Sequence, residues 1–341
     1  MPQSDRVRPL WLRRLRQLLA ASLVCGPALA TAAGFQRVEI AAADGDPALA
    51  VMIWTPCAAA GGTTQLGPYL LAAVAGCEIV GDALPLVAIS HGQGGSLLGH
   101  HNTAVALTEA GFVVISVNHP GDSFGDESAA QSLRIFERRP RDISRAISYM
   151  LTDWPQRQRL DPASIGVFGF SRGGYTALAL AGAVPSAAAG GARFCAGWLS
   201  RVVSPCRQLK GADAAIQVRA DPRIKAAVVL DPLNLFDATG LRRVAVPVQL
   251  WASELGGDGV ELSHVEAVRA ALDPSTEYHV ARGAGHFVYL APCPPALRSS
   301  APRICEDPKG FDRVAWHRQM NASVVAFFKR HLAPARRAGG R

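Results

Sequence analysis

The sequence of 341 residues lacks the patterns that mark several classes of binding protein. It contains neither a G-x-G-x-x-G run nor a Walker lysine, so a nucleotide-phosphate site is not expected. It has no basic cluster with interleaved aromatic residues, which argues against a nucleic-acid partner. It has no C-x-x-C pair or matching histidine spacing, so we expect no metal and no cofactor. No internal repeat and no transmembrane span is apparent either.

The first 33 residues differ in composition from the rest of the chain. Five arginines precede a short apolar run from Leu18 to Leu29, and small-residue cleavage sites end at Ala30 or at Ala32. This order is typical of a secretory signal peptide, and the run is too short for a membrane anchor. We therefore predict an exported protein, periplasmic or secreted, without a stable membrane anchor. The pair Arg13-Arg14 leaves the twin-arginine export route open.

Loss of this leader changes the charge of the mature chain. Removal of residues 1–30 takes away five arginines and one aspartate and lowers the net charge from +8 to about +4. The basic tail 336–341 is expected to be a frayed end rather than a binding arm. Between these ends, residues 34–335 have the length and the apolar content of one globular domain with a sizeable core.

Six cysteines remain after the leader, and an even number in an exported protein indicates disulfides rather than free thiols. Six cysteines permit 15 pairings, among which a sequence cannot decide. We predict that neighbours pair, because each bridge then closes a short loop beside proline or glycine. The predicted pairs are Cys57–Cys77, Cys195–Cys206 and Cys293–Cys305.

Short apolar segments alternate along the chain with segments of helical periodicity. The predicted strands are 35–40, 48–55, 84–90, 112–117, 165–170, 224–230, 244–251 and 277–281. The predicted helices are 101–109, 141–153, 173–183, 260–272 and 311–332. This alternation predicts an α/β fold with a mostly parallel sheet and helices on both faces. Residues 57–83 are interpreted as loop, and residues 184–221 as a lid-like insertion over the sheet.

The segment 167–175 is predicted to be an apolar strand that turns sharply into a helix. Its turn has the pattern G-x-S-x-G, with Ser171 at the apex. In a nucleophile elbow this pattern projects the serine hydroxyl above the sheet. A serine hydroxyl is a poor nucleophile until a base accepts its proton. Ser171 is therefore a candidate nucleophile that needs a base, an acid to orient the base, and N–H donors for the oxyanion.

Candidates for the base and the acid follow later strands. His286 is the predicted base, because it comes after the last predicted strand in a Gly-Ala-Gly-His loop. The order along the chain in this architecture is serine, acid, histidine, which makes Asp258 the first choice for the acid. Glu254 in the same loop and Asp231 at the end of the strand 224–230 are the alternatives. All these residues lie at carboxyl ends of predicted parallel strands, where function gathers in such sheets.

Two backbone N–H groups are needed to bind an oxyanion. The first predicted donor is Arg172, the residue after the nucleophile. The second is Gln93, in the loop His91-Gly-Gln-Gly-Gly95 that follows the strand 84–90. The glycines of this loop let its backbone approach a substrate closely.

Together, the motifs Ile89–Gly95, Val167–Leu180 and Ala284–Cys293 are similar to those of the α/β-hydrolase superfamily. More narrowly, the chain resembles an exported bacterial branch of predicted dienelactone hydrolases related to platelet-activating-factor acetylhydrolases. The likeness covers roughly residues 35–332. It implies a serine esterase with Ser171, Asp258 and His286 as its catalytic triad. True dienelactone hydrolases use a cysteine nucleophile, so the serine at position 171 makes ordinary carboxylic esters the expected substrates.

The resemblance thus implies hydrolysis of a small-molecule ester, with a short- to medium-chain acyl group or a phospholipid-type acetyl group. Two alternatives remain open from the sequence. One is an acyltransferase or peptidase on the same fold, because a fold does not fix the acceptor of the acyl group. The other is a secreted binding module that has no catalytic activity.

Overall fold

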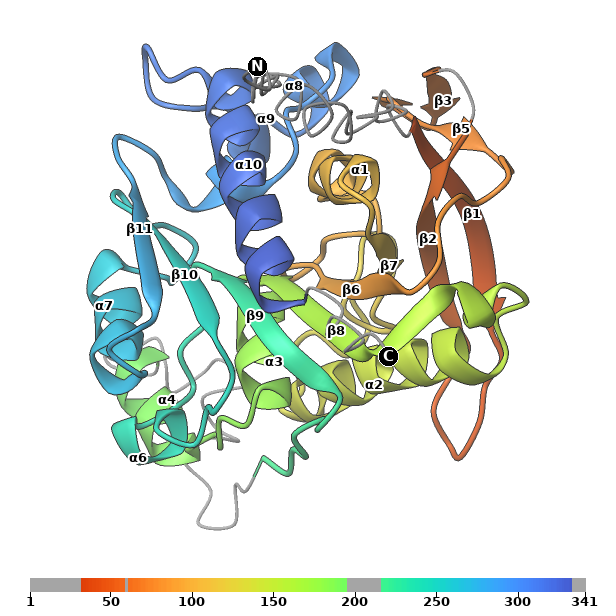
Figure 1. The fold of residues 1–341 in the computed structure, drawn as a ribbon. Coiled ribbons are helices and arrows are strands. Elements are labelled where there is room, and N and C mark those ends of the chain that lie inside the picture. Colours follow the sequence, from red (N-terminus) through yellow and green to blue (C-terminus); the bar gives the residue numbers. More distant parts are fainter. Residues whose placement is uncertain (1–31, 59–60, 195–215, 333–341) are drawn as a thin grey trace, which may run out of the picture. The chain divides into compact units, whose positions relative to one another are not determined.

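The computed structural model describes residues 32–58, 61–194 and 216–332 (Figure 1). The strands are β1 (Ala32–Ile40), β2 (Leu49–Cys57), β3 (Thr64–Leu66), β4 (Tyr69–Leu71), β5 (Val74–Ala75), β6 (Leu84–Ser90), β7 (Val113–Val117), β8 (Leu160–Phe170), β9 (Ile224–Leu230), β10 (Val248–Ser253) and β11 (Glu277–Ala281). The α-helices are α1 (His101–Glu109), α2 (Arg134–Thr152), α3 (Arg172–Leu180), α4 (Ala187–Phe194), α6 (Ala238–Leu241), α7 (Leu262–Ala271), α8 (Pro295–Ser300), α9 (Pro302–Cys305) and α10 (Arg313–His331). Short 3-10 helices span Arg157–Arg159 and His286–Tyr289.

The central sheet has the strand order β11-β10-β9-β8-β6-β7-β2-β1-β5 in the described part of the chain. The pairs from β7 to β11 are parallel, whereas β2 pairs antiparallel with both β1 and β7. The chain leaves β6 for β7 on one side and later returns to β8 on the other side. The carboxyl ends of β6 and β8 therefore form the switch point at which such sheets bind ligands.

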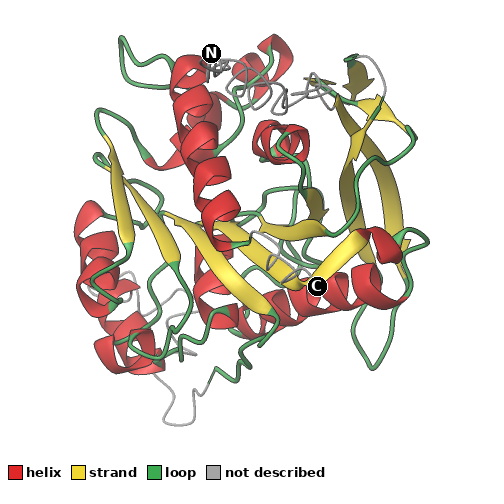
Figure 2. Ribbon diagram, in the orientation of Figure 1, coloured by secondary structure: helices red, strands yellow, loops and turns green. Residues whose placement is uncertain are grey.

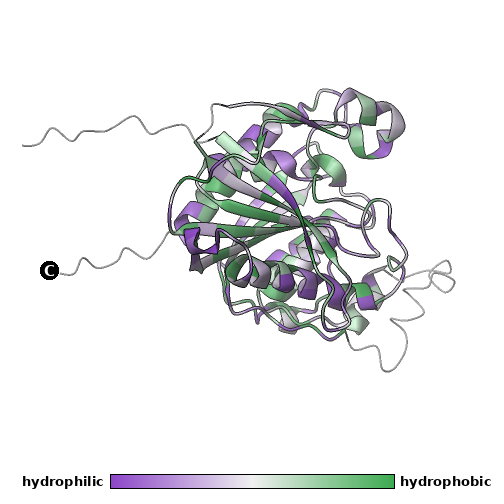
Figure 3. Ribbon diagram, turned by 90° about the vertical axis from the view of Figure 1, so that its right-hand side faces the viewer, coloured by the Kyte–Doolittle hydropathy of each residue, from purple (hydrophilic) through white to green (hydrophobic). Residues whose placement is uncertain are grey.

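The sheet is buried on both faces because alternate side chains of its strands enter two separate cores. In β6, Leu86 and Ala88 belong to one core, and Val87 and Ile89 belong to the other. A strand buried on both faces is apolar throughout rather than alternating, as these segments are. Figure 3 shows the strands of the sheet coloured as hydrophobic between helices of mixed character.

Helices cover each face of the sheet (Figure 2). The first core receives Ile143 from α2, Leu178 from α3 and Val265 from α7. The second core receives Val105 from α1 and Phe328 from α10. The predicted α/β fold with a mostly parallel sheet and helices on both faces is thus confirmed. Of the predicted insertion, residues 184–194 and 216–221 are described, and residues 195–215 lie outside the described part.

Two predictions about individual elements are wrong. Helix α2 begins at Arg134 and not at Arg141, because Pro140 lies inside the helix and does not end it. The segment 57–83 is not all loop, since it forms the hairpin β3–β4 and the short strand β5. Both segments are misleading because proline and glycine usually interrupt regular structure.

Two of the three predicted disulfides are confirmed, namely Cys57–Cys77 and Cys293–Cys305. The third, Cys195–Cys206, lies outside the described residues. The predicted leader lies there too, except for Ala32 and Ala33, which are buried at the start of β1. No helix within the described ranges has the length and apolarity needed to cross a membrane.

Candidate active site

Ser171 occupies a strained turn between β8 and α3. Its backbone has φ 55° and ψ −116°, a conformation that residues other than glycine rarely adopt. The turn is held by hydrogen bonds of 2.9 Å from Ser171 N–H to Leu230 O and of 3.0 Å from Tyr175 N–H to Ser171 O. The surrounding sheet and helix therefore impose the strain, as expected for a nucleophile elbow.

The two flanking glycines are required by close backbone contacts. A Cβ atom on Gly169 would overlap the carbonyl of Gly173, and one on Gly173 would overlap the carbonyl of Ser90. Neither contact can be relieved by a side-chain rotation, because the opposing atoms belong to the backbone. The G-x-S-x-G pattern thus allows α3 to start directly against β6 and β8.

His286 is hydrogen-bonded to Asp231. Its Nδ1 lies 2.9 Å from Asp231 Oδ2, and both side chains are about 1% exposed. Asp231 follows β9 with a positive φ of 40°. It also accepts a 2.7 Å hydrogen bond from Ser253 N–H and a short one from the Ser253 hydroxyl. These contacts fix the carboxylate so that it orients the imidazole through Nδ1.

The structure does not bring Asp258, the first choice for the acid, into contact with His286. The loop of Asp258 passes close to His286, but the residue sits in a turn with φ 51°, and its carboxylate forms a partly exposed ion pair with Arg303. Glu254 also turns outward, where it accepts hydrogen bonds from Arg282 and from Gly283 N–H. Of the three candidates, only Asp231 contacts the histidine.

The second nitrogen of His286 remains available. Its Nε2 is buried and has no hydrogen-bond partner among the described residues. The imidazole packs on Phe170, the residue before Ser171, with 4.6 Å between ring centroids. Catalytic hydrogen bonds are often long in unliganded structures and tighten when substrate binds. This geometry leaves Nε2 free to accept a proton from a group at the elbow.

The loop that follows β6 approaches the elbow closely. A Cβ atom on Gly92 would lie 3.3 Å from the Cβ of Ser171. The next residue, Gln93, carries one of the predicted oxyanion donors. The other donor, Arg172, is the first residue of α3, so its N–H precedes the helical hydrogen-bond ladder. Both N–H groups are thus in backbone segments next to Ser171.

A buried polar network lies beneath this loop. His91 Nδ1 donates to Gly92 O at 2.6 Å, and His91 Nε2 accepts from His119 N–H at 3.2 Å. His119 in turn contacts Ser90 Oγ and Asp142 Oδ2, each at 2.9 Å. Burial lowers the pKa of His91 and His119 well below the usual value, and it raises the pKa of Asp142 to about 7. In the part of the chain that is described, no group of three or more histidine, cysteine, aspartate or glutamate side chains could hold a metal ion.

Two members of the site were missed by sequence reasoning. Asp122 and Arg139 are completely buried next to the elbow and form an ion pair of 2.6 Å. Asp122 lies in a loop after β7 without a recognised pattern, and Arg139 precedes the proline near which the sequence predicts the start of α2. An aspartate and an arginine that pair only through the tertiary fold leave no spacing signal in the sequence.

An apolar cavity of about 420 Å³ lies beside the loop of Gln93. Its walls come from the loops after β6, β7 and β11 and from α8 and α9. They include Gly94, Phe124, Leu290, Leu297 and Ile304. Phe124 is 82% exposed, so an aromatic ring is open to solvent at this cavity. The lining includes Gly94, which directly follows Gln93, and Leu290, which lies four residues after His286.

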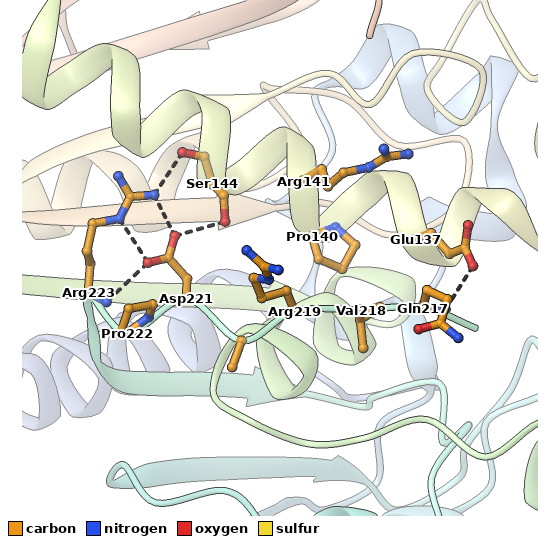
Figure 4. A pocket seen from close by; sticks show the side chains of 11 residues that line it. Glu137, Pro140, Arg141, Ser144, Gln217, Val218, Arg219, Asp221, Pro222 and Arg223 are labelled. Carbon is orange, nitrogen blue, oxygen red and sulfur yellow. Dashed lines mark hydrogen bonds and ion pairs between the residues drawn. The ribbon is translucent and has the colours of Figure 1, made fainter. Parts of the chain in front are cut away.

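A second cavity of about 580 Å³ lies between α2 and the segment 217–223 (Figure 4). Asp221, one of its lining residues, bonds with Arg223 and with Ser144 Oγ. Asp221 comes just before β9, at the amino end of this strand. The cavity is therefore remote from Ser171, which follows the carboxyl end of the neighbouring strand β8.

The sheet order, the elbow after β8 and the histidine after β11 define the α/β-hydrolase fold. A ferulic acid esterase from Streptomyces cinnamoneus has a similar solved structure, with a TM-score of 0.62 over 91% of this chain and 92% of that chain. At 19% sequence identity, this likeness supports the fold alone. No protein-family profile matches the chain, and no curated protein matches it.

Proposed function

We propose that the protein is a serine hydrolase that cleaves carboxylic esters through an acyl-enzyme on Ser171. The observation that carries this proposal is the pairing of His286 with Asp231, which leaves a buried Nε2 without a hydrogen-bond partner among the described residues, beside a strained serine elbow. The solved structure with a similar fold is that of a ferulic acid esterase, and ester hydrolysis is compatible with this fold. A serine, an oriented histidine and an acid on one edge of the sheet are the requirements of acyl transfer.

In the proposed reaction, His286 Nε2 accepts the Ser171 proton while Ser171 Oγ attacks the acyl carbon. The N–H groups of Gln93 and Arg172 stabilise the oxyanion, and Asp231 stabilises the imidazolium through Nδ1. His286 then gives its proton to the leaving alcohol, and the C–O bond to the alcohol breaks. Water, deprotonated by His286, attacks the acyl carbon and releases the carboxylic acid, which restores the Ser171 hydroxyl.

The cavity next to Gln93 supports an ester with an apolar group. Its volume of about 420 Å³ lies in the range of small-molecule sites, and its walls carry mostly apolar side chains. We propose that it receives the apolar part of a short- to medium-chain acyl ester. A phospholipid-type acetyl ester, as in the branch that the motifs resemble, remains a second substrate candidate. The two disulfides support export to an oxidising compartment.

The proposed function is tested with p-nitrophenyl esters of increasing acyl length, measured on the wild type and on Ser171→Ala. We expect hydrolysis by the wild type and a loss of about 10⁴-fold or more in the variant. An Asp258→Asn variant serves as a control for a carboxylate of the neighbouring loop. Hydrolysis by Ser171→Ala at the wild-type rate would contradict the proposal. Formation of new esters or amides with added alcohol or amine acceptors would favour an acyltransferase instead.

A further inference from the structure

Two arginines meet one carboxylate in the buried region under the elbow. Asp122 Oδ2 accepts a 2.6 Å hydrogen bond from Arg139 Nη1, and Asp122 Oδ1 accepts one of 3.1 Å from Arg172 Nη1. The side chains of Asp122 and Arg139 are completely buried, and that of Arg172 is 11% exposed. One carboxylate thus bridges two guanidinium groups in the protein interior.

Each of the two arginines is connected to one of the two predicted oxyanion donors. Arg172 itself carries one donor N–H and is further held by a 3.0 Å hydrogen bond to Ala130 O. Arg139 donates through Nη2 to the carbonyl of His91, at the start of the loop that carries Gln93. The peptide between Gly92 and Gln93 is also fixed, because Gly92 O accepts a hydrogen bond from His91 Nδ1. Asp122 therefore connects the segments that present the two N–H groups.

A buried ion cluster of this kind is not explained by stability. Desolvation of each charge costs several kcal/mol, which often cancels the attraction between the partners. Two guanidinium groups share the Asp122 carboxylate, and Arg139 also interacts electrostatically with the buried Asp142. The guanidinium groups lie beneath the segments that carry the predicted oxyanion donors, where positive charge would stabilise a developing oxyanion.

We propose that Asp122 is a positioning residue that sets the relative placement of the Gln93 and Arg172 N–H groups through Arg139 and through the Arg172 side chain. This inference rests on the proposed ester hydrolysis. It predicts an effect of Asp122 on the transition state although Asp122 itself does not touch substrate. A donor displaced by a fraction of an ångström loses much of its preorganised interaction with the oxyanion.

The test uses Asp122→Asn, which keeps the shape of the side chain but places an amide N–H against one guanidinium. We expect kcat to fall about 10- to 100-fold with KM changed by less than about threefold. The affinity for an aryl boronic acid, which forms a tetrahedral adduct with the serine, should fall by the same factor as kcat/KM. Loss of packing alone would lower Tm without this parallel loss.

Two further variants provide a second test of the cluster and a control. Arg139→Lys retains the positive charge but cannot bond Asp122 and the His91 carbonyl with one planar fork, so a similar loss in kcat is expected. Asp221→Asn is the matched control, since Asp221 is also buried and paired with an arginine, at 2.6 Å from Arg223 (Figure 4), but precedes the amino end of β9 and is remote from the elbow. It should lower Tm and leave kcat unchanged.

The proposal is overturned if folded Asp122→Asn and Arg139→Lys hydrolyse esters at the wild-type kcat. It is also overturned if boronic acid affinity stays constant while kcat falls, or if neither variant folds, because the cluster is then a folding element. These outcomes differ from a failure of the proposed function, in which the wild type itself hydrolyses no ester.

Discussion

Asp231 Oδ2 lies 2.9 Å from His286 Nδ1, whereas the carboxylate of Asp258 is bound to Arg303. Both aspartates follow a parallel strand and precede the histidine in the chain. Only the aspartate after β9 is buried with its carboxylate held by Ser253. Of the two, only Asp231 is therefore in a position to orient the imidazole of His286.

Replacement of the orienting acid should slow catalysis without unfolding the protein. We expect Asp231→Asn to lower kcat for p-nitrophenyl esters by about 10²- to 10⁴-fold, because the amide favours the wrong tautomer of His286. Asp258→Asn is the matched control and should stay within about twofold, since an exposed ion pair contributes little. Steady-state kinetics checks both variants. The reverse ranking of the two would restore Asp258 as the acid.

Gly173, two residues after the serine, is predicted not to tolerate a side chain. Gly173→Ala places a methyl group against the backbone of Ser90, so α3 or the loop after β6 has to move. We expect a destabilisation of about 1–3 kcal/mol, together with a loss of ester hydrolysis in the folded fraction. Urea unfolding monitored by circular dichroism, combined with kinetics, measures both effects.

The control for this glycine is Gly61→Ala, since no atom of the described part of the chain lies within 4 Å of the added Cβ atom there. This variant should unfold at the wild-type urea concentration and keep its activity. A Gly173→Ala variant with wild-type stability and activity would show that the close packing of the elbow is not required.

The free energy of unfolding should decrease as the pH falls below about 6.5. Burial, with a smaller contribution from the nearby His317, lowers the pKa of His100 to about 3, and burial lowers that of His317 to about 4. Below about pH 6.5 the histidines of the unfolded chain bind protons, whereas the buried rings of His100 and His317 in the folded protein do not. Acid therefore favours unfolding. His100 alone should reduce the stability by about 2 kcal/mol at about pH 5.

Urea unfolding at about pH 7.5 and about pH 5 tests this dependence. His100→Gln should flatten the pH dependence, whereas replacement of the exposed His331 by glutamine should leave it unchanged. An equal slope in the wild type and in His100→Gln would contradict the assignment of the acid sensitivity to the buried ring.

A tryptophan in the apolar cavity should change substrate preference and not the chemistry. Leu297→Trp is expected to lower kcat/KM for a hexanoate or aryl ester at least about tenfold and to leave p-nitrophenyl acetate within about twofold. Ala296→Trp on the neighbouring exposed position is the control. A parallel loss for both substrates in Leu297→Trp would show that the cavity does not select the apolar group.

Much of the fold could be predicted because it depends on local patterns. The predicted bounds of the strands β6, β9 and β11 and of the helix α1 match the observed ones, since apolar runs and a helical period mark them. The elbow is found in the same way, because the backbone contacts of Gly169 and Gly173 permit little else. The start of α2 is missed because a proline inside a helix looks like its boundary.

The acid and the buried ion cluster depend on tertiary placement and not on local pattern. Asp231 and Asp258 both satisfy the rule of chain order, and only the direction of each side chain separates them. Asp122, Arg139 and Arg172 are distant in the sequence and meet only when α2, the loop after β7 and α3 pack together. No periodicity or spacing in the sequence predicts these contacts.

Covalent labelling determines directly whether Ser171 is the nucleophile. The wild type and Ser171→Ala are treated with a fluorophosphonate, and intact mass spectrometry with peptide mapping locates the adduct. We expect one adduct per chain on the peptide that contains Ser171, none in Ser171→Ala, and much slower labelling in Asp231→Asn. An unlabelled wild-type chain, or an adduct that persists in Ser171→Ala, would contradict the assignment of Ser171 as the nucleophile.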